Sequence, residues 1–326
     1  MNTNLHNFET GPDFDEFIAS AEEGDLEHFI SLHPEHTKIM QLGAGFFSGA
    51  VQAANFGNFS VHLVTCNQLV EKEVCLGDDK LAFSVCADAR APNPNSPASS
   101  GEHDRVLVMP SGCKTVLISP ADSMSLIVTV NSVSLFAEPI LMPDMVTWFN
   151  QSIVQGEFLL SAIIADRLRE ACHMALSLHA SDSPAEERLN ISTHLLTHLA
   201  TGLTLDWLSR QSFKTCPKPS TVTRFQLARD LLLKCGGMFD AIEKRRIDSL
   251  GCRRSVENAF SETIKMGPVE YSRVLRLNNA REKIHNATFA EASIGDIAAE
   301  EGFWDWSRFS SYYRKQFGEL PSHARR

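Results

Sequence analysis

The spacing of apolar residues changes along the chain, and its first part has the texture of β-structure. Between about residues 38 and 130, short apolar or alternating segments are separated by Gly, Asn, Asp and Pro, which predicts strands joined by turns. Seven strands at this spacing are typical of a small antiparallel barrel or sandwich. The expected strands are Lys38–Leu42, Phe46–Gln52, Phe59–Thr65, Leu81–Cys86, Arg105–Met109, Thr115–Ile118 and Ser125–Val130. A short helix within Asp13–Leu32 is expected before them, and a Pro/Ser/Asn loop at Ala91–Glu102 between them.

From Pro143 to about Leu208 the apolar residues recur every three or four positions, the period of an amphipathic helix. One helix is expected over Gly156–His179. A second begins with Ser183 as its N-cap and Pro184 at its first position. The apolar faces of these two helices have two interpretations. They could close the core of the strand domain, or they could form the seam of a dimer.

A polar, basic stretch with two prolines, Ser209–Thr221, is expected to be a linker, and helices resume after it. The pattern predicts a helix over Val222–Cys235 and a longer one over Pro268–Asn286. Nineteen residues in the second helix would span roughly 28 Å at 1.5 Å per residue. That length is close to one turn of B-DNA, about 34 Å.

The clearest local signals lie between Ser293 and Pro321. Ser293 is a natural N-cap, with Asp296 in the first turn of a short helix that Gly302 ends. A second helix follows from about Asp305, with aromatic residues every fourth position at Phe309, Tyr313 and Phe317. Two short amphipathic helices joined by a tight glycine turn predict a helix-turn-helix, whose second helix enters the major groove of DNA.

Composition and charge agree with this organisation. The chain has 326 residues, 43% of them hydrophobic and 21% charged, as in soluble globular proteins of two or three domains. The net charge is −10, but it is unevenly spread. Residues 221–326 hold 18 Lys and Arg against 14 Asp and Glu, and the remainder holds 12 against 26. A basic C-terminal third behind an acidic body is expected of a DNA reader attached to a regulatory module.

Other function classes find little support in the sequence. No apolar run approaches the ~20 residues that span a bilayer, and the polar N-terminus is not that of a secretory signal, so a cytoplasmic location is expected. The eight cysteines form no C-x-x-C pair and no Cys/His metal spacing. An enzymatic barrel would need converging histidines and a carboxylate, whereas only His62 and His103 lie among the expected strands. Neither an enzyme nor a cofactor is expected.

Three motifs resemble the AraC/XylS family of transcription regulators. They are I-x-x-I-A-x-x-x-G-F at Ile294–Phe303, R-x-x-F-G-x-x-P at Arg314–Pro321 and R-L-x-x-A-R at Arg276–Arg281. The variant GFW at Gly302–Trp304 is most similar to the subgroup that contains the ethanolamine-utilisation regulator. The resemblance implies a DNA-binding domain of two helix-turn-helix units, a cupin-like N-terminal barrel, RNA polymerase as a partner, and a homodimer. By this analogy the seam is the favoured interpretation of the two middle helices.

The resemblance also assigns residues to DNA. In the first unit the reading helix is expected over Arg253–Thr263, although the preceding segment Ala241–Leu250 departs from the family, with Arg246 at an apolar position and a turn one residue short. The family's groove-facing positions fall on Arg254, Ser255 and Asn258, and in the second unit on Trp306, Ser307 and Ser311. Arg308, Arg314 and Lys315 are expected to reach phosphates.

The sequence therefore predicts an α+β chain: a β-rich sensing domain at 1–142, a helical dimerisation or core-closing segment at 143–208, a linker at 209–221, and an all-α tandem helix-turn-helix domain at 222–326. The expected function is a regulator of transcription, an activator that binds double-stranded DNA and responds to a small-molecule effector. Two alternatives stay open. One is a repressor with the same DNA chemistry, and the other is a regulator controlled by a protein partner.

Overall fold

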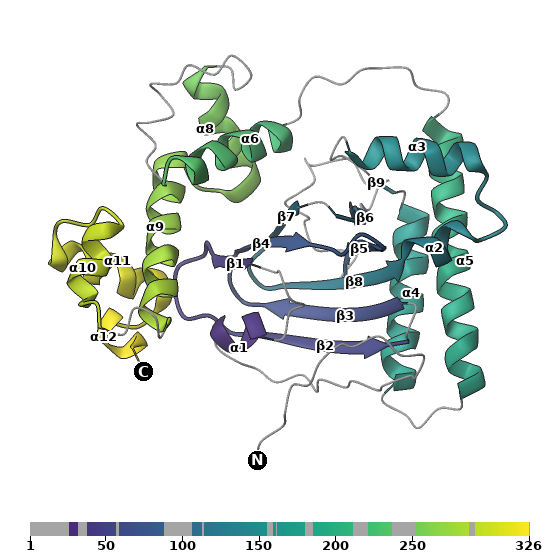
Figure 1. Cartoon of the computed structure of the whole chain (residues 1–326), viewed down its shortest axis with the longest axis horizontal. Helices are drawn as coiled ribbons and strands as arrows, with labels where there is room; N and C mark the ends of the chain where they lie inside the picture. Colours follow the sequence, from purple (N-terminus) through teal and green to yellow (C-terminus); the bar gives the residue numbers. More distant parts are fainter. Residues whose placement is uncertain are drawn as a thin grey trace.

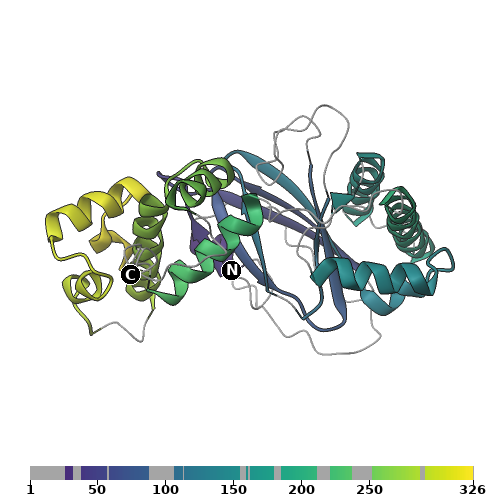
Figure 2. The same ribbon diagram turned by 90° about the horizontal axis from the view of Figure 1, so that it is seen from above.

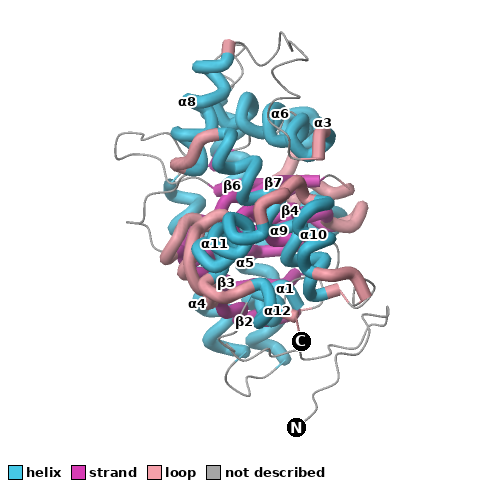
Figure 3. The backbone as a smooth tube through the Cα atoms, turned by 90° about the vertical axis from the view of Figure 1, so that its left-hand side faces the viewer, coloured by secondary structure: helices cyan, strands magenta, loops and turns pink. Residues whose placement is uncertain are grey.

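The computed structural model describes residues 26–31, 38–56, 59–87, 106–112, 114–154, 159–160, 162–179, 185–210, 221–236, 252–286 and 291–325. Within these ranges the strands occupy the middle of the molecule, with helices on both sides (Figures 1 and 2). The C-terminal helices lie at one end of the view, and helices from the middle of the chain lie at the other. Viewed from the C-terminal side, the helices of that end stand in front of the strands (Figure 3).

The strands form two antiparallel sheets. The larger sheet has the order β2-β3-β8-β5-β6-β9, and the smaller has the order β1-β4-β7. The strands are β1 (Lys38–Gln41), β2 (Gly49–Asn55), β3 (Phe59–Cys66), β4 (Val70–Cys75), β5 (Lys80–Cys86), β6 (Val106–Met109), β7 (Lys114–Ser119), β8 (Ser123–Asn131) and β9 (Leu159–Leu160). The prediction of an N-terminal antiparallel β-domain is confirmed. The described strands form two separate sheets and not the closed barrel that was expected.

Two strands were not predicted, and one was misplaced. The segment VEKEVC of β4 reads as polar because Glu71, Lys72 and Glu73 lie in its middle, yet Glu71 and Lys72 are buried. The pair Leu159–Leu160 forms β9, so the expected helix over Gly156–His179 is wrong at its start, and its helical part begins at Ala162. The strand expected at Phe46–Gln52 begins three residues later, because Phe46 and Phe47 belong to the preceding loop.

Helices of the middle segment cover the outer face of the larger sheet. They are α2 (Ser132–Phe136), α3 (Pro143–Val154), α4 (Ala162–His179) and α5 (Ala185–Arg210), after a short α1 (Leu26–Ser31) at the start of the described chain. Side chains of α4 and α5 share one apolar core with the sheet, among them Leu168, Ala171, Leu195, Leu196, Leu199 and Leu203. These residues close the core of their own chain. The core-closing interpretation therefore accounts for them, and they are not available to a dimer seam.

The C-terminal helices are α6 (Thr221–Lys234), α8 (Arg253–Ile264), α9 (Pro268–His285), α10 (Ile294–Glu300), α11 (Trp306–Phe317) and α12 (Pro321–Ala324). Their positions agree with the helices expected at Val222–Cys235, Arg253–Thr263, Pro268–Asn286 and the two of the Ser293–Pro321 stretch. The segment Ala241–Leu250, most of the expected linker, the Ala91–Glu102 loop and residues 13–25 lie outside the described residues. α5 extends to Arg210, into the first positions assigned to the linker.

The smaller sheet packs directly against the C-terminal helices. Met40, Leu42 and Ile118 share a core with residues of α6, α8 and α9, including Phe225, Phe260 and Tyr271. The ring of Phe260 packs edge-on against those of Phe225 and Tyr271, with centroids 4.9 and 5.3 Å apart. Because this core contains residues from both ends of the chain, the C-terminal helices are packed on the smaller sheet.

Two further findings concern the described residues as a whole. No described helix is both long enough and apolar enough to cross a membrane. No cluster of three or more His, Cys, Asp or Glu side chains within the described ranges is arranged to hold a metal ion.

Candidate nucleic-acid interface

The second helix-turn-helix unit consists of α10 and α11, and its geometry follows from its capping residues. Ser293 accepts a hydrogen bond from the backbone N–H of Asp296, and Asp305 accepts one from that of Arg308. Gly302 and Gly318 end the two helices with φ of 75° and 79°, a left-handed conformation that glycine adopts without a steric cost. The sequence predicted the N-cap at Ser293 and the helix end at Gly302, and all four caps together set the length of both helices.

The packing of α11 leaves one face free. Its aromatic residues Phe309, Tyr313 and Phe317 are buried with Ile297 and Ala298 of α10 and with apolar residues of α9. The rings of Phe309 and Tyr313 lie 5.7 Å apart, and those of Tyr313 and Phe317 lie 4.7 Å apart. Ile297 and Ala298 are buried between the helices, each 1% exposed. The opposite face of α11 is left to solvent.

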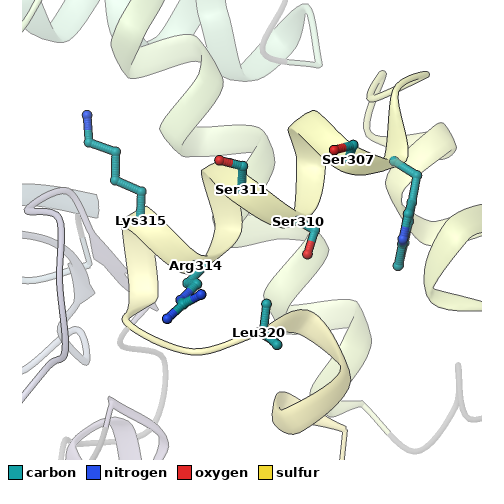
Figure 4. A pocket seen from close by; sticks show the side chains of 7 residues that line it. Ser307, Ser310, Ser311, Arg314, Lys315 and Leu320 are labelled. Atoms are coloured by element: carbon teal, nitrogen blue, oxygen red, sulfur yellow. The ribbon is translucent and has the colours of Figure 1, made fainter.

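All six residues assigned to DNA on α11, namely Trp306, Ser307, Arg308, Ser311, Arg314 and Lys315, are exposed. Five of them, all but Arg308, line an open groove of about 650 Å³ together with Ser310 and Leu320 (Figure 4). Ser307, Ser311 and Lys315 project along one side of the helix. Ser310 and Arg314 project toward Leu320 on the other. The groove therefore presents two rows of hydroxyl and cationic groups beside one aromatic ring.

The sequence did not single out Ser310 or Leu320. Ser310 lies three residues after Ser307 and four before Arg314, so helical spacing alone would have placed it on the same surface. Leu320 precedes α12, and only the fold of that short helix against α11 brings it to the groove. Trp304, in the turn before α11, is 86% exposed and is the most exposed of the large hydrophobic residues in the described part.

The first unit is described from Cys252 onward, and α8 begins at Arg253 as expected. Val256, Ala259, Phe260, Thr263 and Ile264 are the buried residues of α8, and all but Thr263 pack in the core shared with α6, α9 and the smaller sheet. The expected DNA contacts lie on the other side: Arg254 and Asn258 are exposed, and Ser255 is half-buried. The core shared with α6, α9 and the smaller sheet therefore covers the back of α8, and the assigned reading face stays uncovered.

Charged groups near the two reading helices differ in how firmly they are held. Arg308 lies 3.5 Å from the carboxylate of Asp305, but its side chain is 77% exposed, so the pair is weak and can exchange for a phosphate. Arg253 forms an (i,i+4) pair with Glu257 at 2.9 Å. Within the described residues no ion pair involves Arg254, Arg314 or Lys315, and these three cations face solvent.

Two groups at the edges of the units have shifted pKa values. A hydrogen bond with Ser255 lowers the pKa of the thiol of Cys252, which occupies the N-cap position of α8. Burial lowers the pKa of the Arg276 guanidinium, which lies 4.8 Å over the ring of Phe303 and donates to the carbonyls of Glu301 and Gly302. Arg276 thus ties the turn of the second unit to α9.

Comparison with known proteins agrees with this geometry. Residues 252–326 match a family model described as a helix-turn-helix domain. The same region is similar to the XylDLEGF operon transcriptional activator of Pseudomonas putida, 36% identical over 73 residues, which are 22% of this chain and 23% of the relative. Activator 2 of the same operon is 36% identical over 69 residues, 21% of this chain and 44% of that relative. The alignments thus span less than half the length of these curated relatives.

Two solved structures are similar to a larger part of the chain. The AraC-like transcriptional activator CuxR aligns with 86% of this chain and 98% of its own, at 13% identity and a TM-score of 0.40. The fatty-acid-bound ToxT of Vibrio cholerae aligns with 88% and 93%, at 12% identity and a TM-score of 0.26. The likeness of Gly302–Trp304 to the ethanolamine-utilisation subgroup stays a prediction. Residues 252–326 therefore carry a helix-turn-helix domain that is similar to the C-terminal part of the XylDLEGF operon transcriptional activators.

Proposed function

We propose that the whole chain is a sequence-specific DNA-binding regulator that activates transcription. The observation that carries this proposal is that α11 has one buried face and one exposed face. Its aromatic face is buried against α9 and α10, while its six assigned residues are exposed and five of them line one groove. A short helix held by its back, with hydroxyl and cationic groups on its free face, has the form that enters a major groove.

The residue types suggest a division of labour between the units. In the first unit, Arg254 suits guanine and Asn258 suits adenine, each through two hydrogen bonds to a base edge, and Ser255 adds a weaker contact. In the second unit, Ser307 and Ser311 read bases weakly, and Trp306 suits the methyl group of thymine. Arg308, Arg314 and Lys315 contact phosphates, which positions the protein without reading sequence.

A small-molecule effector is part of the proposal, and a buried cation on the smaller sheet supports it. Lys72 of β4 is 2% exposed and lies 5.3 Å from the ring centroid of Phe29. Burial lowers the pKa of Lys72 to about 8 and that of His62, on β3, to about 4. A cation in an otherwise apolar interior suits an anionic effector. If small carboxylates raise the melting temperature of the wild-type chain and not of Lys72→Met, the effector is supported over a protein partner.

The other expected partners are proposals as well. A homodimer would use surfaces other than the leucines of α4 and α5 that close the core, and the outward side of α4, with exposed His173 and Met174, is one such surface. Recruitment of RNA polymerase, a cytoplasmic location and the absence of enzymatic activity follow from the regulator assignment. A promoter fusion separates an activator from a repressor, because deletion of the chain lowers expression in the first case and raises it in the second.

The experiment that tests the proposal is selection of duplexes from a random-sequence library by the full-length chain. The expected result is enrichment of a motif with two boxes, each the short stretch of base pairs that one reading helix contacts, about one helical turn apart. A matched selection with Arg254→Ala/Asn258→Ala should lose the information in one box and keep it in the other. If the wild-type chain enriches no motif at all, it is not a sequence-specific DNA-binding protein.

A further inference from the structure

Two glutamines connect the N-terminal sheet to the second reading helix, and their arrangement is reciprocal. Gln41 ends β1, and Gln316 lies near the end of α11. The side-chain amide of Gln41 donates to the backbone carbonyl of Gln316 at 2.9 Å, and that of Gln316 donates to the carbonyl of Gln41 at 3.1 Å. Gln41 is 0% exposed and Gln316 is 5% exposed, so water does not compete for these bonds.

The loop that follows Gln41, residues 42–46, wraps around the end of α11. Gln316 also donates to the carbonyls of Leu42 and Gly43, at 3.3 and 2.9 Å. Gln41 closes the loop by donating to the carbonyls of Gly43 and Gly45, and the N–H of Gly45 donates to the carbonyl of Gln316. A Cβ placed on Gly318, the C-cap of α11, would come within 3.0 Å of the backbone of Phe46. The end of the helix and the loop are therefore in direct backbone contact.

The same residue holds the helix between the two units. The backbone N–H of Gln41 donates to Oδ1 of Asn278 on α9 at 3.1 Å, and Nδ2 of Asn278 donates back to the carbonyl of Gln41 at 2.9 Å. Its neighbours Met40 and Leu42 pack in the core that contains α8. Residues 40–46 thus share an apolar core with the first reading helix, and they form hydrogen bonds with α9 and the second reading helix.

We infer that Gln41 is a positioning residue for DNA reading: with residues 42–46 it fixes α11 relative to α9 and α8, and so sets the distance and angle between the two reading helices. This inference rests on the proposed function, because it concerns how two helix-turn-helix units address one duplex. Arg314 and Lys315 directly precede Gln316, so loss of the reciprocal bonds loosens the end of α11 that carries both cations. The first unit keeps its apolar packing.

The test uses the full-length chain and a duplex it has selected, with zero, one or two base pairs inserted between the boxes. Each inserted pair moves the second box by about 3.4 Å and turns it about the axis. Wild type should lose affinity by roughly tenfold per inserted pair, the equivalent of about 1.4 kcal/mol. Gln41→Ala and Gln316→Ala should each lose less than about threefold per inserted pair, since the second helix can then follow its box. The double variant should show the same loss per inserted pair as each single variant, because either substitution alone already breaks the contact between Gln41 and Gln316.

Gln226→Ala, on α6 and outside the hydrogen bonds that join residues 41–45 to α9 and α11, is the matched control and should keep the wild-type spacing preference. Binding to a duplex with the first box alone reports that each variant is folded, and it should be unchanged. The inference is overturned if Gln41→Ala and Gln316→Ala retain the wild-type spacing preference. If Gln41→Ala fails to fold, Gln316→Ala decides alone, since it leaves the sheet intact. A wild-type chain that selects no duplex contradicts the proposed function instead.

Discussion

Arg229 on α6 donates from Nε to the carboxylate of Glu71 on β4, and the two residues, 158 positions apart, are 4% and 2% exposed. The same guanidinium reaches Glu73 at 3.0 Å, and the hydroxyl of Tyr271 donates to the second oxygen of Glu71 at 2.8 Å. Burial raises the pKa of Glu71, although Arg229 and Tyr271 favour its charged form. This buried network, together with the apolar core around it, fixes the C-terminal helices on the smaller sheet.

Replacement of Arg229 by Met should destabilise the chain strongly, because it leaves the Glu71 carboxylate buried without its cation. Breaking a buried pair from one side costs about 3–5 kcal/mol. Urea unfolding of the full-length chain measures this loss, and Lys234→Met on the exposed side of α6 is the matched control, with an expected change near zero. An Arg229→Met chain as stable as wild type would show that the network does not stabilise the packing of the C-terminal helices on the smaller sheet.

A pH dependence is expected from His62. Burial lowers its pKa to about 4, whereas the unfolded chain has the ordinary value near 6.5. Between these values the unfolded chain holds a proton that the folded chain lacks, so the free energy of unfolding should fall as the pH falls from 6.5 toward 4. The slope should be about 1 kcal/mol per pH unit, and His62→Gln should reduce it. Urea unfolding at pH 7 and pH 5 checks this, and equal slopes in the two proteins would contradict it.

Ala298→Asp should unfold the second helix-turn-helix unit. Ala298 is 1% exposed between α9, α10 and α11, and a carboxylate there is buried without a partner at a cost of several kcal/mol. The measurements are the melting temperature and the affinity for a selected duplex. Ala299→Asp, one position along the same helix and half-buried, is the control and should cost much less. Unchanged melting and DNA affinity in Ala298→Asp would mean that this helix does not pack as the structure shows.

Base reading and phosphate anchoring should separate by mutation. Arg254→Ala and Asn258→Ala should relax the preference at particular operator positions, by about 1–3 kcal/mol each. Arg314→Ala should weaken binding to all sequences alike and lower the salt slope by about one unit. A base-substitution scan of each box against the three variants distinguishes these outcomes. Uniform loss from Arg254→Ala and Asn258→Ala would shift the assigned register of α8, and position-specific loss from Arg314→Ala would reverse its role.

The second unit was predictable because its signals are local. Ser293, Gly302, Asp305 and Gly318 cap two short helices, and the period of the aromatic residues identifies the buried face of α11. The strand β4 was not predictable, since Glu71 is buried against Arg229, which lies on another element far along the chain. Three consecutive charged residues, Glu-Lys-Glu, are expected to be exposed unless a residue that pairs with them in the interior is known.

The sequence also indicated which face of each helix is apolar, but it did not indicate which element packs against that face. The leucines of α4 and α5 fall on one side of each helix, which agrees equally well with a dimer seam and with a sheet beneath them; only the fold selects the sheet. The contact between Gln41 and Gln316 is of the same kind, since nothing local to either residue indicates the other. Eight of the nine residues assigned to DNA are exposed on their helices and Ser255 is half-buried, and the contacts of all nine with DNA stay predictions.

The claim that two exposed reading helices engage DNA is tested most directly by the salt dependence of binding. The measurement is fluorescence anisotropy of the full-length chain with a selected duplex across a series of KCl concentrations. The logarithm of the association constant should fall linearly with that of the salt concentration, with a slope of about −0.9 for each phosphate contacted. With Arg308, Arg314 and Lys315 among the contacts, the slope should be steeper than about −2.5. A slope near zero, or no binding at low salt, would contradict the assignment of these helices to DNA.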